Sequence, residues 1–401
     1  MAGTASASDA RTAEELATRL LQATLGAFDI FGVYLGDRLG LYRTLVEAGP
    51  VTPPDLAARA GIDERYAREW LEQQAVTGIL DVHDGTADPN QRKFSLPSAH
   101  AETLLNVESL NYLSPIARMS VAVAQQLPAL MEAFRTGGGV AWEAFGPDMW
   151  QGQAAINRPL FANLLGRQYL PMIPDLHRRL DEPGARVADI GCGAGWSSIA
   201  IAQAYSSAHV DGFDLDADAI EQARRNATEA GIADRVDFSA RDITSDPALR
   251  DRYDLVTIFE ALHDMPRPVH MLAAMRGMLT QGGSVLIMDE RVADRFTAPG
   301  DEVERLMYGW SILTCLPGAM TDKSSAATGT VMRSDLCADT LTRLASESRK
   351  SFPSKTTSSA SIDCDPSESQ NGPSAGSNTP SLPSPTGGGE APRPSALASR
   401  L

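Results

Sequence analysis

One segment constrains the fold of this chain more than any other, the run VADIGCGAGWSSIAIAQAY that begins at Val187. Its first residues are apolar, three glycines follow within five residues, and small and apolar residues then continue at helical spacing. The pattern predicts a strand, a tight turn and a helix. Because glycine tolerates positive φ and carries no Cβ, a ligand can approach the bare backbone of such a turn.

Short apolar runs continue to alternate with amphipathic stretches through the rest of this region. Such alternation predicts a parallel sheet with helices on both faces, which is an α/β, Rossmann-like architecture. The expected strands are ARVADIG, HVDGFDL, RVDFSAR, YDLVTIFEAL and GGSVLIMDE.

Three acids stand at or near the ends of the first three expected strands: Asp189, Asp214 and Asp242. Ligands of open α/β sheets bind at the carboxyl edge of the strands, so these acids are expected to meet beside the glycine turn. A carboxylate about twenty residues after the turn, as Asp214 is, can bind both hydroxyls of a ribose. A dinucleotide-binding turn needs a third glycine at position 196, which is Trp196 here, and this disfavours a pyrophosphate ligand.

The amino-terminal part has a different pattern. Residues 1–11 are small and polar and are expected to be disordered, and the apolar periodicity that follows predicts a helical region that is mostly core. The stretch from Val51 to Val82 predicts a helix-turn-helix with its turn at Gly61, and DVHDGTADPNQRKFSLP predicts two short strands. Together they predict a winged-helix domain over residues 12–100.

The winged helix leaves two interpretations open. A DNA-binding module would place its second helix in the major groove, but residues 63–72 carry four acids against Arg65 and Arg68. The whole chain has 35 Lys and Arg against 51 Asp and Glu, a net charge of −16, which also disfavours binding to phosphate backbone. A packing or dimerisation module is the alternative, and a homodimer is expected.

The expected cellular location of the protein and the state of its cysteines follow from signals that the sequence lacks. It shows neither a basic, apolar leader nor a run of roughly 20 apolar residues that could span a bilayer, so a cytoplasmic protein without membrane contact is expected. Its cysteines, Cys192, Cys315, Cys337 and Cys364, are far apart, so the spacing suggests free thiols and neither a disulfide framework nor a metal site.

Residues 101–180 are expected to form a helical linker and substrate lid, interrupted by the glycines at 137–139. Aromatic residues gather in this stretch. Since small-molecule sites are often built between domains, Trp150 and Phe161 are candidates for lining the substrate, and the alternative is that they pack in a core.

The motifs DIGCGAG, FDLD, ARDI and FEALHDM resemble a class I S-adenosylmethionine-dependent methyltransferase over roughly residues 183–333. With its winged-helix half, the chain is similar to two-domain small-molecule O-methyltransferases, nearest to a bacterial branch. The resemblance implies that Gly191, Gly193 and Gly195 pass the methionine part of S-adenosyl-L-methionine. It also implies that Asp214 holds the ribose and Asp242 the adenine amino group, while Asp189 steadies the turn or the cofactor's ammonium.

The same resemblance makes His263 the candidate catalytic base, since an HD pair follows the fourth strand in these enzymes. A base is needed when the acceptor is a hydroxyl, and histidine titrates in the right range. Met265 and Pro266 depart from the family pattern, which usually has Trp and an acid here, so a packing histidine is the alternative. Asp289 and Glu290, after the fifth strand, are candidates for orienting His263 or are solvated acids.

The methyltransferase domain is expected over residues 181–335, yet the two terminal strands of that fold have no counterpart in the sequence. From 336 to 401 the chain is rich in Ser, Pro and Gly, which predicts disorder. A shifted reading frame across this tract would restore an apolar, family-like ending. The tail is therefore interpreted as disordered or frameshifted, with activity impaired by the altered ending.

The function expected from these observations is methylation of a small organic acceptor at oxygen by S-adenosyl-L-methionine, with no metal required. The alternative is a winged-helix transcriptional regulator that uses the methyltransferase fold to sense a ligand. A further alternative is an inactive gene product.

Overall fold

The computed structural model describes residues 12–333, and the expectations for residues 1–11 and for the tail from 336 lie outside them. The chain forms two compact units. The first holds the chain up to Pro128 together with Glu143–Pro159, and the second holds Ala129–Trp142 together with the chain from Leu160. The segment 101–180, expected as one linker and lid, is thus divided between both units.

The first unit contains the winged helix that the sequence predicts. Helix α3 (Pro53–Ala60) ends at Gly61 in a left-handed conformation, and α4 (Glu64–Val76) begins at Asp63, whose carboxylate accepts the N–H groups of Arg65 and Tyr66. The wing consists of β1 (Asp81–Val82) paired antiparallel with β2 (Phe94–Ser95). Helix α2 (Leu41–Ala48) completes its hydrophobic core.

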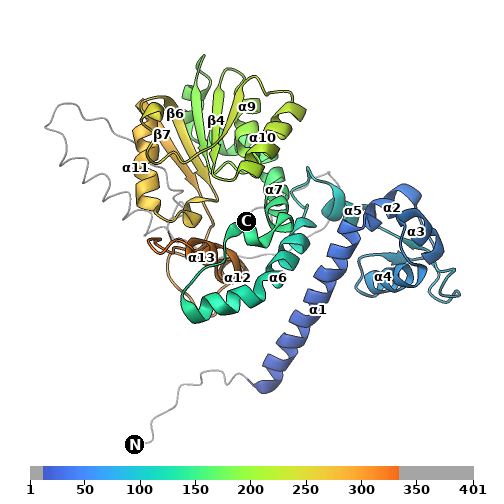
Figure 1. The fold of residues 1–401 in the computed structure, drawn as a ribbon. Coiled ribbons are helices and arrows are strands. Elements are labelled where there is room, and N and C mark those ends of the chain that lie inside the picture. Colours follow the sequence, from blue (N-terminus) through green and yellow to red (C-terminus); the bar gives the residue numbers. More distant parts are fainter. Residues whose placement is uncertain (1–11, 334–401) are drawn as a thin grey trace, which may run out of the picture. The chain divides into compact units, whose positions relative to one another are not determined.

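Helix α1 (Ala13–Arg38), drawn in blue in Figure 1, is not the core element that its periodicity predicts. Its carboxyl-terminal part packs where Gly32 and Gly36 let α4 and α2 approach, and the Trp70 Nε1–H donates to the Gly32 carbonyl at 2.9 Å. Seven of its large apolar side chains are 41–60% exposed: Leu16, Leu20, Leu21, Leu25, Phe28, Phe31 and Leu35. Amphipathicity predicted the helix correctly, but it did not show what covers its apolar face.

Three further helices follow the wing: α5 (Ser98–Leu105), α6 (Pro115–Thr136) and α7 (Pro147–Leu160). Within the first unit, Arg118 of α6 makes a bidentate ion pair with Asp37 of α1, with one N···O distance of 2.9 Å. Helix α6 ends at the run of glycines 137–139, as predicted from the sequence.

A five-stranded parallel sheet forms the centre of the second unit, and each strand falls on one of the five predicted runs. The strands are β3 (Arg186–Ile190), β4 (His209–Asp214), β5 (Val236–Ala240), β6 (Tyr253–Phe259) and β7 (Leu279–Met288). Their order is β5-β4-β3-β6-β7. The chain reverses direction across the sheet between β3 and β6, and at such a switch point a crevice opens beyond the strand ends.

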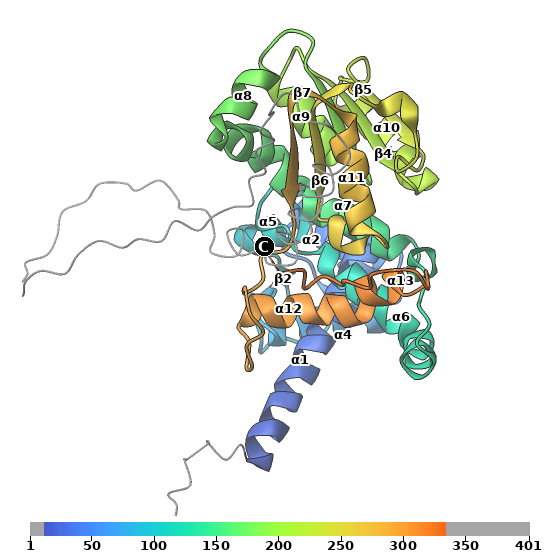
Figure 2. The same ribbon diagram turned by 90° about the vertical axis from the view of Figure 1, so that its left-hand side faces the viewer.

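Helices cover both faces of this sheet (Figures 1 and 2). One face packs against α8 (Pro174–Leu180), α9 (Trp196–Ala204), α10 (Ala217–Glu229) and the π-helical segment η2 (Phe161–Tyr169). The other packs against α11 (Pro268–Met278) through Met271, Leu272, Met275 and Met278. After β7 come α12 (Glu302–Trp310), the π-helical turn η6 (Ser311–Cys315) and α13 (Leu316–Ala319).

Among residues 12–333, the sheet has these five strands, and the place of the two terminal strands lies outside the described chain. No helix in the same range is both long and apolar enough to cross a bilayer.

Candidate active site

The glycine turn joins β3 to α9, and all three of its glycines have positive φ: 68° at Gly191, 51° at Gly193 and 80° at Gly195. Their surroundings differ. A Cβ on Gly195 would lie 2.6 Å from the Phe238 ring, and one on Gly191 would lie 2.9 Å from the Ala261 Cβ. A Cβ on Gly193 would meet nothing within 4 Å. Gly191 and Gly195 therefore permit close packing, and Gly193 is the glycine that borders open space.

Asp189 lies beneath this turn and is 1% exposed. Its carboxylate accepts hydrogen bonds from Ser197 and Ser198 of α9, both at 2.6 Å, and from Thr257 of β6 at 2.8 Å. Burial raises its pKa, and the three hydroxyl donors oppose the rise. Of the two roles expected for Asp189, this geometry matches the one of steadying the turn, because the side chain ties the strand, the helix and the neighbouring strand together.

Asp214 ends β4 with its carboxylate directed at the turn. One oxygen accepts the N–H of Gly193 at 2.8 Å, and the other accepts the N–H of Asp216 at 3.0 Å. A carboxylate has about four acceptor sites, and the N–H of Leu215 also bonds to Asp214, so some acceptor capacity remains for a hydroxyl of a ligand. Burial raises its pKa, and these backbone N–H groups oppose the rise.

Asp242 follows β5 and is exposed. It accepts the backbone N–H and the hydroxyl of Thr244 at 2.8 and 2.7 Å, and these hydrogen bonds lower its pKa. Its local partner is therefore Thr244, and its carboxylate stays ionised and open to solvent.

A second group of polar side chains forms where β6 and β7 end. His263 is 4% exposed, and its Nδ1 lies 2.6 Å from an Asp289 oxygen while its backbone N–H donates to the other oxygen at 3.3 Å. Burial alone lowers the pKa of His263, but its hydrogen bonds to Asp289 and Cys315 and the charge of Asp264 raise it to about 12. The structure thus joins His263 to Asp289, and the imidazole is protonated at neutral pH.

Glu260 and Glu290 add further acid to this end of the sheet. The last paired residues of β6 and β7 are Phe259 and Met288, so Glu260 directly follows one strand and Glu290 stands two residues beyond the other. Burial, then the nearby charges of Glu260 and Asp289, raise the pKa of Glu290 to about 8. Glu260 has φ of 51°, a strained conformation for a residue with a side chain, and such strain gathers at functional sites.

The structure also brings Cys315 of η6 to His263, although the cysteine spacing suggested no such cluster. His263 and Cys315 share a hydrogen bond. Sequence reasoning missed both Cys315 and Glu260. Glu260 could have been found as the first acid of the FEALHDM motif, but no local signal marks Cys315.

The two aromatic candidates for the substrate site belong to different units. Phe161 is 7% exposed within the core of the second unit, and its ring centroid lies 5.9 Å from that of Phe259. Trp150 is partly buried on α7 in the first unit. Phe161 thus packs beneath the strand that leads to Glu260, which is the alternative that the sequence left open.

Comparison with known families agrees with the sheet and its glycine turn. Residues 181–344 match the model described as a methyltransferase domain. The chain carries a methyltransferase domain. Ahead of this methyltransferase domain, residues 29–106 match the model of an Rv2258c-like winged helix-turn-helix domain, which agrees with the winged helix of the first unit.

Individual curated proteins are also similar to this chain in sequence. The ubiquinone biosynthesis O-methyltransferase of Marinobacter nauticus is 30% identical over 115 residues, which cover 28% of this chain and 47% of that protein. The chain spans about half the length of the curated relatives it matches.

Two solved structures share the fold. An O-methyltransferase family protein from Burkholderia thailandensis has a TM-score of 0.62 at 16% identity, covering 84% of this chain and 93% of that one. Human N-acetylserotonin methyltransferase in complex with SAM has a TM-score of 0.59 at 18% identity, with coverage of 84% and 93%.

Proposed function

We propose that this protein is an S-adenosyl-L-methionine-dependent methyltransferase that methylates a small organic acceptor at oxygen. The observation that carries the proposal is the position of Gly193, which borders open space and donates its N–H to Asp214 at the switch point of the sheet. The relatives support it, since those named above are O-methyltransferases and the human N-acetylserotonin methyltransferase structure holds SAM.

The residues at the turn fit this cofactor. Asp214 keeps acceptor capacity for the ribose, and the bare backbone at Gly193 leaves room for the methionine part. Asp242 is exposed and ionised, so it can accept the adenine amino group. Asp189 acts indirectly, because its carboxylate is enclosed by hydroxyl donors and holds the turn in shape. When bound, the sulfonium supplies the methyl group for an in-line displacement.

The chain's contribution to the chemistry is alignment and proton removal. We propose that neutral His263 accepts the hydroxyl proton of the acceptor at Nε2. Asp289 fixes the ring through Nδ1 and stabilises the imidazolium that results. Because the pKa of His263 is raised to about 12, only a small fraction is neutral at pH 7, and turnover should rise with pH through the neutral range.

Glu290 is the second candidate for the proton acceptor. Its pKa of about 8 lies near neutrality, where a base combines sufficient strength with a sufficient deprotonated fraction. Either assignment keeps proton removal at the ends of β6 and β7, one strand away from the glycine turn.

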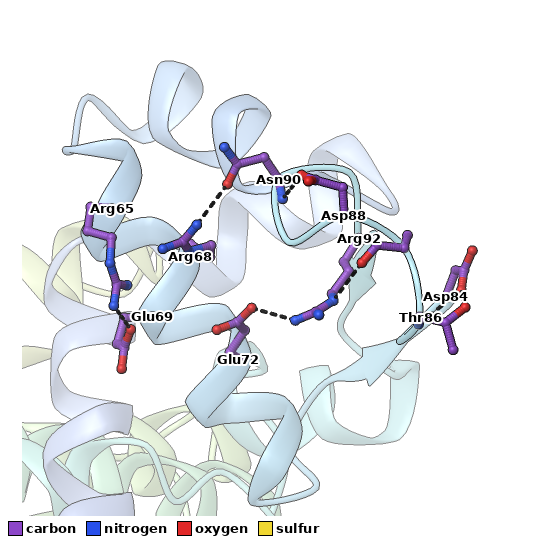
Figure 3. Close-up of polar contacts among 10 residues, drawn as sticks. Arg65, Arg68, Glu69, Glu72, Asp84, Thr86, Asp88, Asn90 and Arg92 are labelled. Atoms are coloured by element: carbon purple, nitrogen blue, oxygen red, sulfur yellow. Dashed lines mark hydrogen bonds and ion pairs between the residues drawn. The ribbon is translucent and has the colours of Figure 1, made fainter.

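In this proposal the winged helix is a packing or dimerisation module and does not bind DNA. Figure 3 shows that the arginines on and beside α4 are occupied: Arg65 pairs with Glu69, Arg92 pairs with Glu72 at 2.7 Å, and Arg68 donates to Asn90 at 3.3 Å. Because Arg65 and Arg92 already pair with acids, this surface has little net positive charge to neutralise phosphates.

A homodimer and a cytoplasmic location complete the proposal. The exposed apolar face of α1 is a surface that a second copy can cover, since single large apolar faces are costly to leave in water. The free thiols Cys192 and Cys315 suit a reducing compartment.

Calorimetric titration of the full chain with S-adenosyl-L-methionine and with its demethylated product tests the function directly. One binding site per chain for both compounds is expected. Retention on duplex DNA at physiological salt without heat from either compound would support the transcriptional regulator instead.

A further inference from the structure

The proposed proton acceptor, His263, lies close to two other side chains that carry different ligand atoms. His263 and Asp264 lie on the short helix η5 (Leu262–Asp264) that follows β6, and Cys315 ends η6. One ligand atom from each, a ring nitrogen, a carboxylate oxygen and the thiol sulfur, lies within 4.8 Å of both others. The His263 Nε2 is 3.5 Å from an Asp264 oxygen.

These separations match those of a tetrahedral metal site. Zinc binds nitrogen and oxygen at about 2.0–2.2 Å and thiolate sulfur at about 2.3 Å, so tetrahedral ligands stand roughly 3.3–3.6 Å apart. The nitrogen and oxygen of this cluster are already at that spacing, and the sulfur, within 4.8 Å of both, would move closer on binding. A nitrogen, an oxygen and a sulfur together favour a borderline ion such as Zn²⁺ over Mg²⁺ or Ca²⁺, which prefer oxygen alone.

The surroundings of His263 prepare it to be a ligand. Asp289 holds Nδ1 at 2.6 Å, and a carboxylate on one ring nitrogen orients the other nitrogen toward a metal and increases its basicity. The Asp264 side chain is 46% exposed, which gives an ion access to the otherwise buried histidine.

We propose that a single divalent ion of the zinc class binds to His263 Nε2, the Asp264 carboxylate and the Cys315 thiolate, leaving one position for water. Binding releases the protons of the thiol and of Nε2 to solvent. The second part of the proposal rests on the function proposed above: the same nitrogen lone pair cannot hold a metal and accept a proton, so the metal inhibits methyl transfer.

Titration of the metal-free full chain with Co²⁺, a coloured substitute for Zn²⁺, tests the site without cofactor or acceptor. We expect one equivalent of Co²⁺ to produce a thiolate-to-cobalt charge-transfer band, and one equivalent of Zn²⁺ to abolish it. Cys315→Ser should remove the band, and the matched variant Cys192→Ser, which changes the other described thiol, should keep it.

Two further variants keep the test decisive if Cys315→Ser does not fold. Asp264→Asn changes a half-exposed side chain and should weaken Co²⁺ binding at least tenfold, with the circular dichroism spectrum unchanged. Asp289→Asn leaves all three ligands in place and should weaken binding about ten- to a hundredfold through the orientation of His263.

Absence of a charge-transfer band, or a band that Cys315→Ser leaves intact, overturns the site. The activity measurement then examines the second part on its own: Zn²⁺ should inhibit turnover in proportion to occupancy, and a chelator should restore it. Full turnover with the metal bound would leave the site standing but contradict both the inhibition and the role of His263 as proton acceptor.

Discussion

In the methyltransferase domain, the acids beside the glycine turn and the acids at the ends of β6 and β7 have different surroundings. At the glycine turn, Asp189 and Asp214 receive hydrogen bonds from hydroxyls and backbone N–H groups, which are neutral donors with fixed positions. At the ends of β6 and β7, Asp289 and Glu290 lie near Glu260 and near the ionisable groups His263 and Cys315.

This difference separates binding from chemistry. Neutral donors hold a carboxylate in one state, which suits a rigid cradle for a cofactor. At the ends of β6 and β7, burial and neighbouring charges raise the pKa of Glu290 to about 8, so this group exchanges its proton near neutral pH. Variants at the glycine turn should therefore change cofactor affinity, whereas variants at the ends of β6 and β7 should change turnover.

The largest effect is expected from His263→Ala. Losing a general base should lower kcat by about a hundred- to ten-thousandfold, and cofactor affinity should stay within about twofold because the cradle is intact. Steady-state kinetics and calorimetry on the same preparation measure both quantities. His209→Ala, at the opposite end of β4, is the matched control and should retain activity. Equal losses in affinity and turnover would erase the distinction between the two ends.

Gly195→Ala and Gly193→Ala compare two glycines of one turn. The Cβ at 195 would lie 2.6 Å from the Phe238 ring, in a backbone with φ of 80°, so overpacking and left-handed strain should together cost about 2–5 kcal/mol of stability. The Cβ at 193 meets open space, so only the strain of about 1–2 kcal/mol applies there. Denaturant unfolding measures the two costs, and similar values would show that Gly193 does not border a ligand space.

Asp214→Ala should weaken S-adenosyl-L-methionine binding about ten- to a hundredfold, which corresponds to losing one charge-assisted hydrogen bond of roughly 1.5–3 kcal/mol. Calorimetry provides the affinity, and kcat at saturating cofactor should change little. Asp237→Asn alters an exposed acid on neighbouring β5 and should leave the affinity unchanged. An unaltered affinity in Asp214→Ala would refute its assignment to the ribose.

Glu290→Gln should give the smallest effect, seen in the pH dependence of stability. The folded-state pKa of about 8 exceeds the ordinary 4.5, so the folded protein binds this proton more tightly and its stability falls as pH rises between those values. The variant lacks that loss, so its unfolding free energy should increase relative to that of the wild type as pH rises across this window. Glu229→Gln, exposed at the end of α10, is the control. A constant difference from pH 5 to 8 would contradict the shifted pKa.

Much of the fold could be predicted because its signals are local. Strand runs, the glycine turn and the turn of the helix-turn-helix at Gly61 each depend on a few consecutive residues, and all appear where the sequence predicted them. The exposed face of α1 could not be predicted in this way. Periodicity shows that a helix has an apolar side, but whether that side is buried depends on which element packs there.

Some features of the candidate site could likewise be predicted from local sequence, and others could not. The sequence by itself placed Asp189, Asp214, His263 and Asp289 at the ends of strands, because the carboxyl ends of parallel strands share one edge. Only the tertiary structure decided that Gly193 faces open space while Gly195 packs against Phe238. It alone brought Cys315 to His263, because that contact depends on how the segment from α12 to α13 folds back over the strand ends, and no residue spacing encodes it.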